Sequence, residues 1–306
     1  MGIASPTNKA RNNSLCAFLD ASFRLFYNSF FTILFLRYEM PIITLLTDFG
    51  LRDTFIGVMK GVIWSISPNV QIVDLTHEIP AQRVVDGALA IAGAAPYFPA
   101  GTIHVCVVDP GVGTTRRPML AAIGDQYFIG PDNGLFSLLI KKTEDLTTPP
   151  VYIALNKTHY WLPQVSNSFH GRDIFAPVAA HLANGVKLEE LGDPFENPMM
   201  ISIPMPQQTS DGWLGQVMQV DHFGNLVTNI TKEQLKPSGG VNISVKNTVI
   251  NEVVATFGSK PAGELIAMFD SSGHLAISVV NGSASDRLGV KVDEIVRLTL
   301  PSEQAS

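Results

Sequence analysis

Cysteine is scarce in this chain. Among 306 residues only Cys16 and Cys106 occur, and Cys106 lies within an apolar run. With so few cysteines a disulfide framework is not expected, because scaffolds of that kind are dense in paired cysteines. We therefore expect the protein to work in a reducing compartment, and a cytoplasmic location is predicted.

Clusters of basic residues are missing as well. The net charge is −6, and no run of Lys or Arg is longer than the pairs Arg116-Arg117 and Lys141-Lys142. Proteins that bind nucleic acid neutralise backbone phosphates with concentrated positive charge. No nucleic-acid partner is therefore expected.

No apolar run in the N-terminal region is long enough to span a membrane. The apolar stretch Phe26–Leu36 falls short of the ~20 residues that a span needs, and Asp20 and Arg24 interrupt what precedes it. No small-residue cleavage site follows, as a signal peptide would require. Residues 1–39 are expected to be an N-terminal extension that is disordered or does not belong to the natural protein, with Met40 as the alternative start. No membrane partner is expected.

From Met40 onward, short buried runs alternate with helical spacing. The run "PIITLLTDFG" is typical of a buried strand. Phe55 to Ile66 has apolar residues at helical spacing, with Pro68 as the stop. Strands alternating with helices predict an α/β domain over residues 40–203, with a mainly parallel sheet flanked by helices.

The sequence changes in character after residue 203. A stretch that contains Pro and Gln, residues 204–211, indicates a linker. Short strand-like segments follow, separated by Gly, Asn and Ser turns, and they predict a small all-β domain, a barrel or a sandwich, over residues 211–306. The segments are "WLGQVMQVD", "NLVTNI", "VNISVKNTVI", "EVVATF", "LIAMFD", "HLAISVV" and "DEIVRLTL".

Polar side chains follow the ends of four predicted strands in the first domain. In parallel sheets, ligands gather beyond the carboxyl ends of the strands. Any one of these clusters alone is explained as a helix cap or a loop hydrogen bond, but four at successive strand ends predict a functional site. The clusters are Thr47-Asp48 with Asp53, Asp74 with His77, Asp109 with Arg116, and residues 167–173.

Two familiar motifs do not explain this site. "TDFG" at residues 47–50 resembles a kinase magnesium motif, but no glycine-rich loop, paired lysine or catalytic loop accompanies it. "DPGVGTTRRP" lacks the Gly-Lys-Ser/Thr ending of a phosphate loop. A metal site is not expected, because the candidate ligands have no tight spacing, although a metal-dependent hydrolase stays an alternative. The candidate ligands are His77, His104, His170, Asp48 and Asp109.

Six motifs, taken in order, resemble one family. They are "TDFG…D" at residues 47–53, "VDLTHEIP" at 73–80, "VVDPGVGTTRRP" at 107–118, "GPDNGL" at 130–135, "SFHGRDIFAP" at 168–177 and "VDHFGNLVTNI" at 220–230. The chain from Met40 to about Leu300 is thereby similar to the S-adenosyl-L-methionine (SAM) hydroxide adenosyltransferase family, the SAM hydrolases, which are related to the fluorinase and the chlorinase. The resemblance implies hydrolysis of SAM to adenosine and methionine without a metal or redox cofactor.

The resemblance also implies a catalytic triad of Asp109, Arg116 and His170 that handles the attacking water. The substrate is a sulfonium, so methionine leaves as a neutral molecule and needs no acid, whereas water is a poor nucleophile and must be oriented and relieved of a proton. Asp109 or His170 can accept that proton, and the choice between them stays open. Arg116 would hold negative charge in place with its fixed fork of donors.

Substrate contacts follow from the same resemblance. Asp48 matches the acceptor of both ribose hydroxyls, Asp221 the partner of the methionine ammonium, and Ser271 the group that receives the methionine carboxylate. Ser272 stands where the fluorinase has an arginine, which puts part of that last contact in doubt. The complete predicted set is Asp48, Asp53, Gln82, Phe169, Asp221, Phe223, Asn225, Ser271, Val280 and Gly282.

Three alternatives accompany this prediction. A halide-using adenosyltransferase is disfavoured, because Asp109, Val112 and Gly171 replace the tyrosine, threonine and serine of the fluorinase and an anionic Asp109 would repel a halide. A sensor that binds SAM or adenosine and a metal-dependent hydrolase are the others. The resemblance further implies a homotrimer in which each site lies between the N-terminal domain of one subunit and the C-terminal domain of the next.

Overall fold

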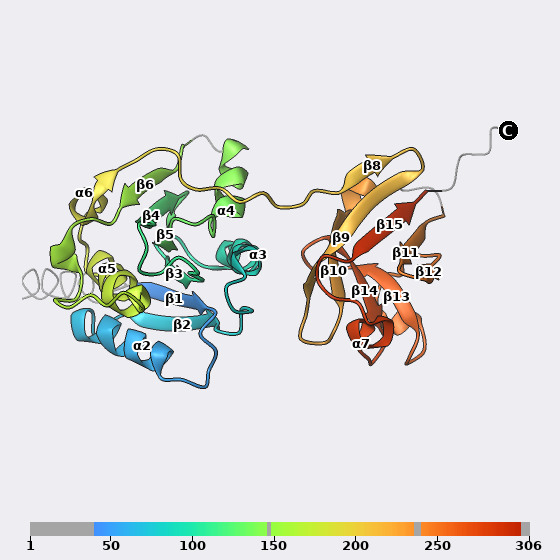
Figure 1. The fold of residues 1–306 in the computed structure, drawn as a ribbon, viewed down its shortest axis with the longest axis horizontal. Helices are drawn as coiled ribbons and strands as arrows, with labels where there is room; N and C mark the ends of the chain where they lie inside the picture. The colour runs from blue at the N-terminus through green and yellow to red at the C-terminus, as the bar shows by residue number, and fades with distance from the viewer. Residues whose placement is uncertain (1–39, 146–147, 236–239, 301–306) are drawn as a thin grey trace, which may run out of the picture. The chain divides into compact units, whose positions relative to one another are not determined.

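The computed structural model describes residues 40–145, 148–235 and 240–300. The predicted extension, residues 1–39, lies outside the described residues. A seven-stranded sheet built from β1 to β7 and an eight-stranded sheet built from β8 to β15 account for the architecture (Figure 1). Each sheet has a hydrophobic core of its own.

The N-terminal sheet runs in the order β2-β1-β3-β5-β4-β6-β7. Its central strands β1 and β3 are almost entirely buried, as expected for strands covered on both faces. The strands are β1 Ile42–Thr47, β2 Gln71–Thr76, β3 Ile103–Val107, β4 Pro118–Ile123, β5 Gln126–Pro131, β6 Val151–Ala154 and β7 Asp193–Pro194.

The expectation of a mainly parallel sheet is wrong, because the sheet is mixed. Strand β1 pairs in parallel with β2 and β3, and β3 with β5, but β4 is antiparallel to β5 and β6, and β6 to β7. Only Gly124 and Asp125 separate β4 from β5, and so short a connection forces a hairpin. Neither β4 nor this hairpin is among the elements expected from the sequence.

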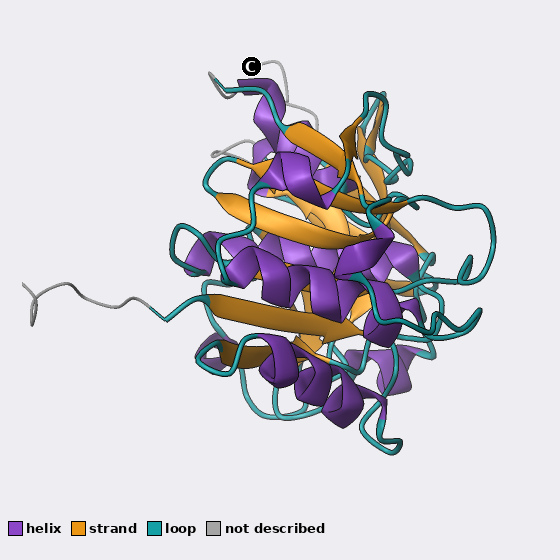
Figure 2. Cartoon of the chain, turned by 90° about the vertical axis from the view of Figure 1, so that its left-hand side faces the viewer, coloured by secondary structure: helices purple, strands orange, loops and turns teal. Residues whose placement is uncertain are grey.

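Helices cover both faces of the N-terminal sheet (Figure 2). One face packs on α2 and α5 through Met59, Ile63 and Val178, and the other on α3 and α4. The bounds of α2 match the predicted helix. None of the helices within the described ranges combines the length and apolarity that crossing a membrane would require. The α-helices of this domain are α2 Phe55–Ile66, α3 Val84–Ala94, α4 Ser137–Lys141, α5 Ala176–Ala183 and α6 Leu188–Leu191, whereas α7 Ala284–Leu288 lies in the C-terminal domain.

The C-terminal sheet runs in the order β12-β11-β15-β9-β10-β14-β13, and β8 pairs with β9. All of its strand pairings are antiparallel. The strands are β8 Gln207–Thr209, β9 Gly212–Val220, β10 Leu226–Thr231, β11 Asn242–Val245, β12 Thr248–Ile250, β13 Leu265–Phe269, β14 His274–Val279 and β15 Ile295–Thr299.

This sheet curls into a nearly closed barrel, one of the two architectures expected from the sequence. A bridge between Val253, just after β12, and Ala267 of β13 links the two ends of the sheet. The predicted strand "EVVATF" contributes only that bridge. The predicted strand "VNISVKNTVI" divides into β11 and β12, because Lys246 takes a left-handed conformation (φ 49°) and turns the chain.

His104 is a polar residue inside the N-terminal core. Its side chain is fully buried on β3, its Nδ1 lies 2.7 Å from the hydroxyl of Thr44, and its ring stacks on Phe128 at 4.9 Å. Burial lowers the pKa of His104 to about 4, against a weaker opposing effect of Gln126. The ring is therefore neutral in the folded protein at physiological pH, and between pH 6.5 and about 4 it becomes charged only on unfolding.

We expect His104 to make the protein sensitive to acid. Between pH 6.5 and about 4 the unfolded chain binds a proton at His104 and the folded chain does not. The free energy of unfolding therefore decreases as the pH is lowered, by up to about 1.4 kcal/mol per pH unit. His104→Gln should remove that share of the slope. Urea unfolding over this pH range measures it, and equal slopes in both proteins would contradict the prediction.

Candidate active site

Asp48 and Asp109 lie beyond the carboxyl ends of two neighbouring parallel strands. Strands β1 and β3 pair so that their last residues, Thr47 and Val107, are partners. Asp48 follows the first end by one residue and Asp109 follows the second by two. Both carboxylates therefore leave the sheet at the edge where α/β proteins bind their ligands.

Asp109, Arg116 and His170 form one chain of hydrogen bonds. Arg116 Nε donates to both oxygens of Asp109, at 3.0 Å to Oδ1 and 2.9 Å to Oδ2, and Nη2 of the same guanidinium also donates to Oδ2. This Nη2 lies 2.7 Å from Nδ1 of His170. The side chains of Asp109 and Arg116 are only 4% and 9% exposed. The structure thus brings the three residues together in a site largely shielded from water.

The contact with Arg116 fixes the protonation of His170. A guanidinium can only donate, so Nδ1 accepts and the neutral ring carries its proton on Nε2. Burial lowers the pKa of His170, and the charge of Arg116 lowers it further, against the opposing effects of Asp109, Asp173 and the Ser166 carbonyl. His170 is therefore neutral at physiological pH and, in this tautomer, has no nitrogen free to take a proton.

An aromatic ring also packs against the guanidinium of Arg116. The ring of Phe175 lies 5.4 Å from its Cζ, a cation–π distance. Its Nη1 is buried and has no hydrogen-bond partner within the described residues. A buried donor without a partner is costly and is more typical of functional sites than of ordinary cores.

A glycine turn connects Asp109 to Arg116. Val112 N donates to Asp109 O, and the hydroxyl of Thr114 donates to Gly111 O at 2.7 Å, so the turn is closed by its own hydrogen bonds. Gly113 has φ +76°, and a Cβ added there would lie 2.2 Å from the carbonyl oxygen of Asn167. Only glycine allows the turn to press against the loop that carries His170.

Asp48 is held by the segment before α3. One of its oxygens, Oδ2, accepts the backbone N–H of Gln82 at 2.8 Å, and Gln82 itself has φ 64°. Asp48 and Gln82, both members of the predicted substrate-binding set, are therefore in contact, although they are 34 positions apart. Asp53, in contrast, lies exposed in the loop before α2.

The strand end that carries Asp48 is secured by a hydrogen-bond network that runs from buried Thr47 and His77 to the partly exposed Asp74 and Lys60. The hydroxyl of Thr47 lies 2.9 Å from His77 Nδ1, and Asp74 is within 3.0 Å of His77 Nε2 and 2.6 Å of Lys60 Nζ. This network supports the backbone next to Asp48. Within the described ranges, no group of three or more His, Cys, Asp or Glu side chains is placed to hold a metal ion.

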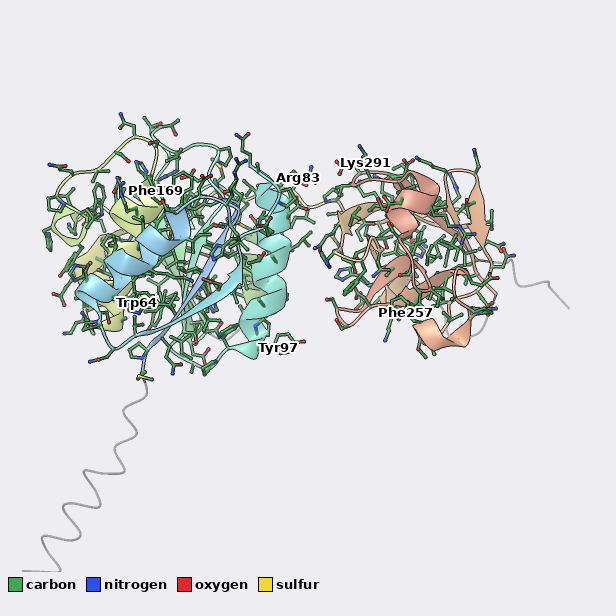
Figure 3. All side chains as sticks on the ribbon, turned by 90° about the horizontal axis from the view of Figure 1, so that it is seen from below. Trp64, Arg83, Tyr97, Phe169, Phe257 and Lys291 are labelled. Atoms are coloured by element: carbon green, nitrogen blue, oxygen red, sulfur yellow. The ribbon has the colours of Figure 1, made fainter. Side chains whose placement is uncertain are left out.

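Phe169 belongs to an aromatic cluster beside the triad. Its ring centroid lies 5.8 Å from Phe49 and 5.3 Å from Phe55, both edge-to-face, and Arg172 stacks over it at 5.0 Å. Phe55 is 43% exposed, so this cluster offers an apolar surface at the edge of the sheet (Figure 3 labels Phe169).

In the C-terminal domain, Asp221 organises the turn between β9 and β10. Its Oδ1 accepts the backbone N–H groups of Phe223 and Asn225, and its Oδ2 accepts from Asn225 Nδ2 at 2.7 Å. Gly224 has φ +80° and packs on Ser283, where a Cβ would approach the hydroxyl to 2.1 Å. The turn therefore lies against the loop that contains Gly282.

A cavity of about 700 Å³ opens beside this turn. One wall of the cavity is formed by four barrel strands, whose cross-strand neighbours Gln219, Val227, Ala276 and Met268 make a mostly apolar row. Phe257, labelled in Figure 3, is also part of the lining. Five of the residues predicted to bind substrate line this cavity: Asp221, Phe223, Asn225, Ser271 and Gly282.

Val280 does not line that cavity. It is 7% exposed, its N–H donates to Glu264 O, and its carbonyl accepts from Gly263 N. Its backbone groups are therefore engaged within the domain, whereas the neighbouring Asn281 and Gly282 face the cavity.

Both parts of the described chain match models of one family. The SAM hydroxide adenosyltransferase N-terminal domain matches residues 43–192, and the corresponding C-terminal domain matches residues 215–297. The chain belongs to the SAM hydroxide adenosyltransferase family. The triad therefore lies in the first family domain and the cavity in the second.

Curated members of the family are similar over most of their length. The (R)-S-adenosyl-L-methionine hydrolase of Salinispora tropica is 38% identical over 261 residues, which cover 85% of this chain and 98% of that protein. The protein of the same name from Thermus thermophilus is 39% identical over 258 residues, 83% of this chain and 97% of that protein. The fluorinase of Actinopolyspora mzabensis is 26% identical over 300 residues, 86% of this chain and 98% of that protein.

A solved structure has the same fold. The crystal structure of an uncharacterized conserved protein from Thermotoga maritima superposes with a TM-score of 0.77 at 34% sequence identity. The match covers 84% of this chain and 99% of that one. The similarity therefore extends over both SAM hydroxide adenosyltransferase domains.

Two residues of this candidate site do not follow from the sequence. Phe175 is one of many apolar residues around α5, and nothing in the sequence indicates that its ring lies under Arg116. The other is Asp173, the last residue of the predicted polar cluster 167–173, to which the sequence assigns no role. In the structure, the complete burial of Asp173 indicates that it has a role, because an ionised carboxylate is not buried without dedicated partners.

Gly113→Ala should damage the site more than an equivalent change elsewhere. Gly101 provides the matched control, since it has a similar φ of +79° but no heavy atom within 4 Å of an added Cβ. Both variants bear the cost of a left-handed alanine, about 1–2 kcal/mol. Only Gly113→Ala must also push Asn167 away. Thermal unfolding of both variants measures the difference in stability. An equal loss of stability would show that the glycine turn and Asn167 can move apart without additional cost.

Proposed function

We propose that this protein hydrolyses S-adenosyl-L-methionine to adenosine and L-methionine by in-line attack of water on C5′ of the ribose. The hydrolases named above, 38% and 39% identical over nearly their whole length, provide the substrate and the reaction. The observation that carries the proposal is the buried chain Asp109–Arg116–His170, which offers fixed donors beside a carboxylate that can accept a proton from water and would repel a halide.

The reaction needs few groups from the protein. The water oxygen forms a bond to C5′ while the C5′–S bond breaks, and its electron pair returns to sulfur, so the sulfonium becomes the neutral thioether of methionine. The water loses one proton. Because Nδ1 of His170 already accepts from Arg116, we assign that proton to Asp109, whose carboxylate oxygens keep lone pairs beyond the bonds to Arg116.

The charge of the C-terminal cavity fits this substrate. Asp221 and Asp270 line it, and no Lys or Arg is among its lining residues. SAM carries two positive groups, the sulfonium and the ammonium, and the mostly apolar row of the cavity suits a purine ring. We propose that Asp221 pairs with the ammonium, Phe223 and Asn225 contact the adenine, and Asp48 binds the ribose hydroxyls.

Other assignments have less support. A halide-using enzyme is the function of the fluorinases, which match at 26% to 28% identity, well below the hydrolases. A sensor that only binds SAM would not need a shielded carboxylate beside oriented donors. The homotrimer with sites between subunits and the cytoplasmic location remain proposals drawn from the family resemblance and the scarcity of cysteine.

Heavy-oxygen water tests the reaction directly. The purified chain incubated with SAM, chelator and ¹⁸O-labelled water should form adenosine with the label at its 5′ oxygen, detected by mass spectrometry. Asp109→Ala should lower the rate by about 10²-fold or more, the usual loss when a general base is removed. Asp193→Asn, an exposed carboxylate paired with Lys157, is the control and should keep its activity.

Each alternative gives a different result in this experiment. Unchanged SAM would leave only binding, a 5′-halo product formed on addition of chloride or fluoride would indicate halide transfer, and loss of turnover with chelator would indicate a metal-dependent hydrolase. Labelled adenosine formed equally well by Asp109→Ala would retain hydrolysis but remove Asp109 from the mechanism.

Mixing two inactive variants tests the proposed shared site. Asp109→Ala damages the N-terminal half of a site and Asp221→Ala the C-terminal half. If each site in a trimer combines halves from two subunits, random mixed trimers should regain about a quarter of the wild-type sites. The variants are unfolded and refolded together before the assay. No recovery in verified mixed trimers would place each site within one chain.

A further inference from the structure

Asp173 is a fully buried carboxylate with a complete set of donors. Its side chain is 0% exposed, and its Oδ2 accepts from both the backbone N–H and the hydroxyl of Ser166, each at 2.8 Å. Arg172 donates to its two oxygens at 2.6 and 3.1 Å. Burial alone would raise the pKa of Asp173, but the hydrogen bonds from Arg172 and Ser166 outweigh it and hold the pKa below its usual value. Asp173 is thus a fixed negative charge.

Ser166 connects this carboxylate to His170. Its hydroxyl donates to Asp173 and accepts the backbone N–H of Phe169 at 3.1 Å, which fixes the residue next to His170. Its backbone also raises the pKa of the His170 ring. A movement of Ser166 would therefore change both the backbone and the ring environment of His170.

The helical turn between His170 and Asp173 gives a second connection. Gly171–Phe175 is a π-helical turn that continues directly into α5, and the N–H of Asp173 donates to Phe169 O at 3.1 Å. Turns of this type occur frequently at functional sites. Both ends of the segment that carries His170 are thereby held through Asp173.

Charges on three sides act on His170. Arg116 faces it from the glycine turn, Asp109 from the end of β3, and Asp173 from its own turn. Burial and Arg116 lower the pKa of the ring, whereas the two carboxylates raise it. Asp173 thus opposes Arg116 without contacting the triad directly.

We propose that Asp173 is a positioning residue for the triad, which acts through Ser166 to hold His170 in the orientation and tautomer that receive the hydrogen bond from Arg116. The role in catalysis rests on the proposed function, whereas the effect on His170 itself does not. Asp132 shows that burial of an arginine-paired carboxylate is not enough for this role. It is 5% exposed and binds Arg117 and the N–H of Met199, so its side-chain hydrogen bonds go to partners outside the segment 166–173.

The test compares Asp173→Asn with Asp132→Asn in the full chain. In each protein the pKa of His170 is read from NMR titration of histidine-labelled samples, with His170→Gln used to assign the signal, and kcat and KM are measured with SAM. Asp173→Asn should lower the pKa of His170 and reduce kcat by about 10- to 100-fold, the usual cost of a misplaced catalytic group, with KM changed less than about threefold. Asp132→Asn should lower the Tm but leave the His170 pKa at its wild-type value.

Ser166→Ala provides a second variant that keeps the charge of Asp173. It removes the hydroxyl that joins Asp173 to Phe169, and it should reduce kcat in the same direction even if Asp173→Asn fails to fold. Ser166→Thr retains the hydroxyl and should retain activity. A His170 pKa and a kcat equal to wild type in Asp173→Asn or Ser166→Ala would overturn the proposal, and so would equal pKa shifts in Asp173→Asn and Asp132→Asn. If the wild-type protein does not turn over SAM, the proposed function fails while the titration still decides the effect on His170.

Discussion

The arrangement of the candidate site depends on one guanidinium. Arg116 donates to the carboxylate of Asp109 and to the imidazole of His170 at once, and a planar fork of donors can do this only if both partners lie close to its plane. Lysine at this position would offer a point charge without that geometry. The guanidinium is held in place by the turn before it, which needs glycine at Gly113 to lie against Asn167, and by the ring of Phe175, over which it lies.

The two domains contribute different physical properties to the proposed reaction. The N-terminal domain provides the shielded polar chain that would orient water, on the loops that follow β3 and β6. The C-terminal domain provides a cavity with a mostly apolar wall and a negative lining from Asp221 and Asp270. A cationic substrate with an aromatic ring suits the cavity of the C-terminal domain. A neutral leaving group suits the N-terminal domain, because no acid is required to release it.

Much of the fold was predictable from the sequence because it depends on local patterns. The apolar spacing of Phe55–Ile66 predicts α2 with its bounds, and the alternating segments after residue 211 predict most strands of the barrel. The mixed sheet was not predictable in the same way. Strand β4 has no clear alternation, and its direction is set by the two-residue hairpin to β5 rather than by its own composition.

The sequence by itself determined which residues are candidates, since the family motifs are linear and name Asp109, Arg116 and His170. Only the tertiary structure decided that Arg116 reaches across 54 positions to His170, that the ring is neutral with its proton on Nε2, and that Asp173 is buried behind it. Hydrogen bonds between distant segments and the burial of a charge depend on how loops meet in space, and no local pattern of residues encodes them.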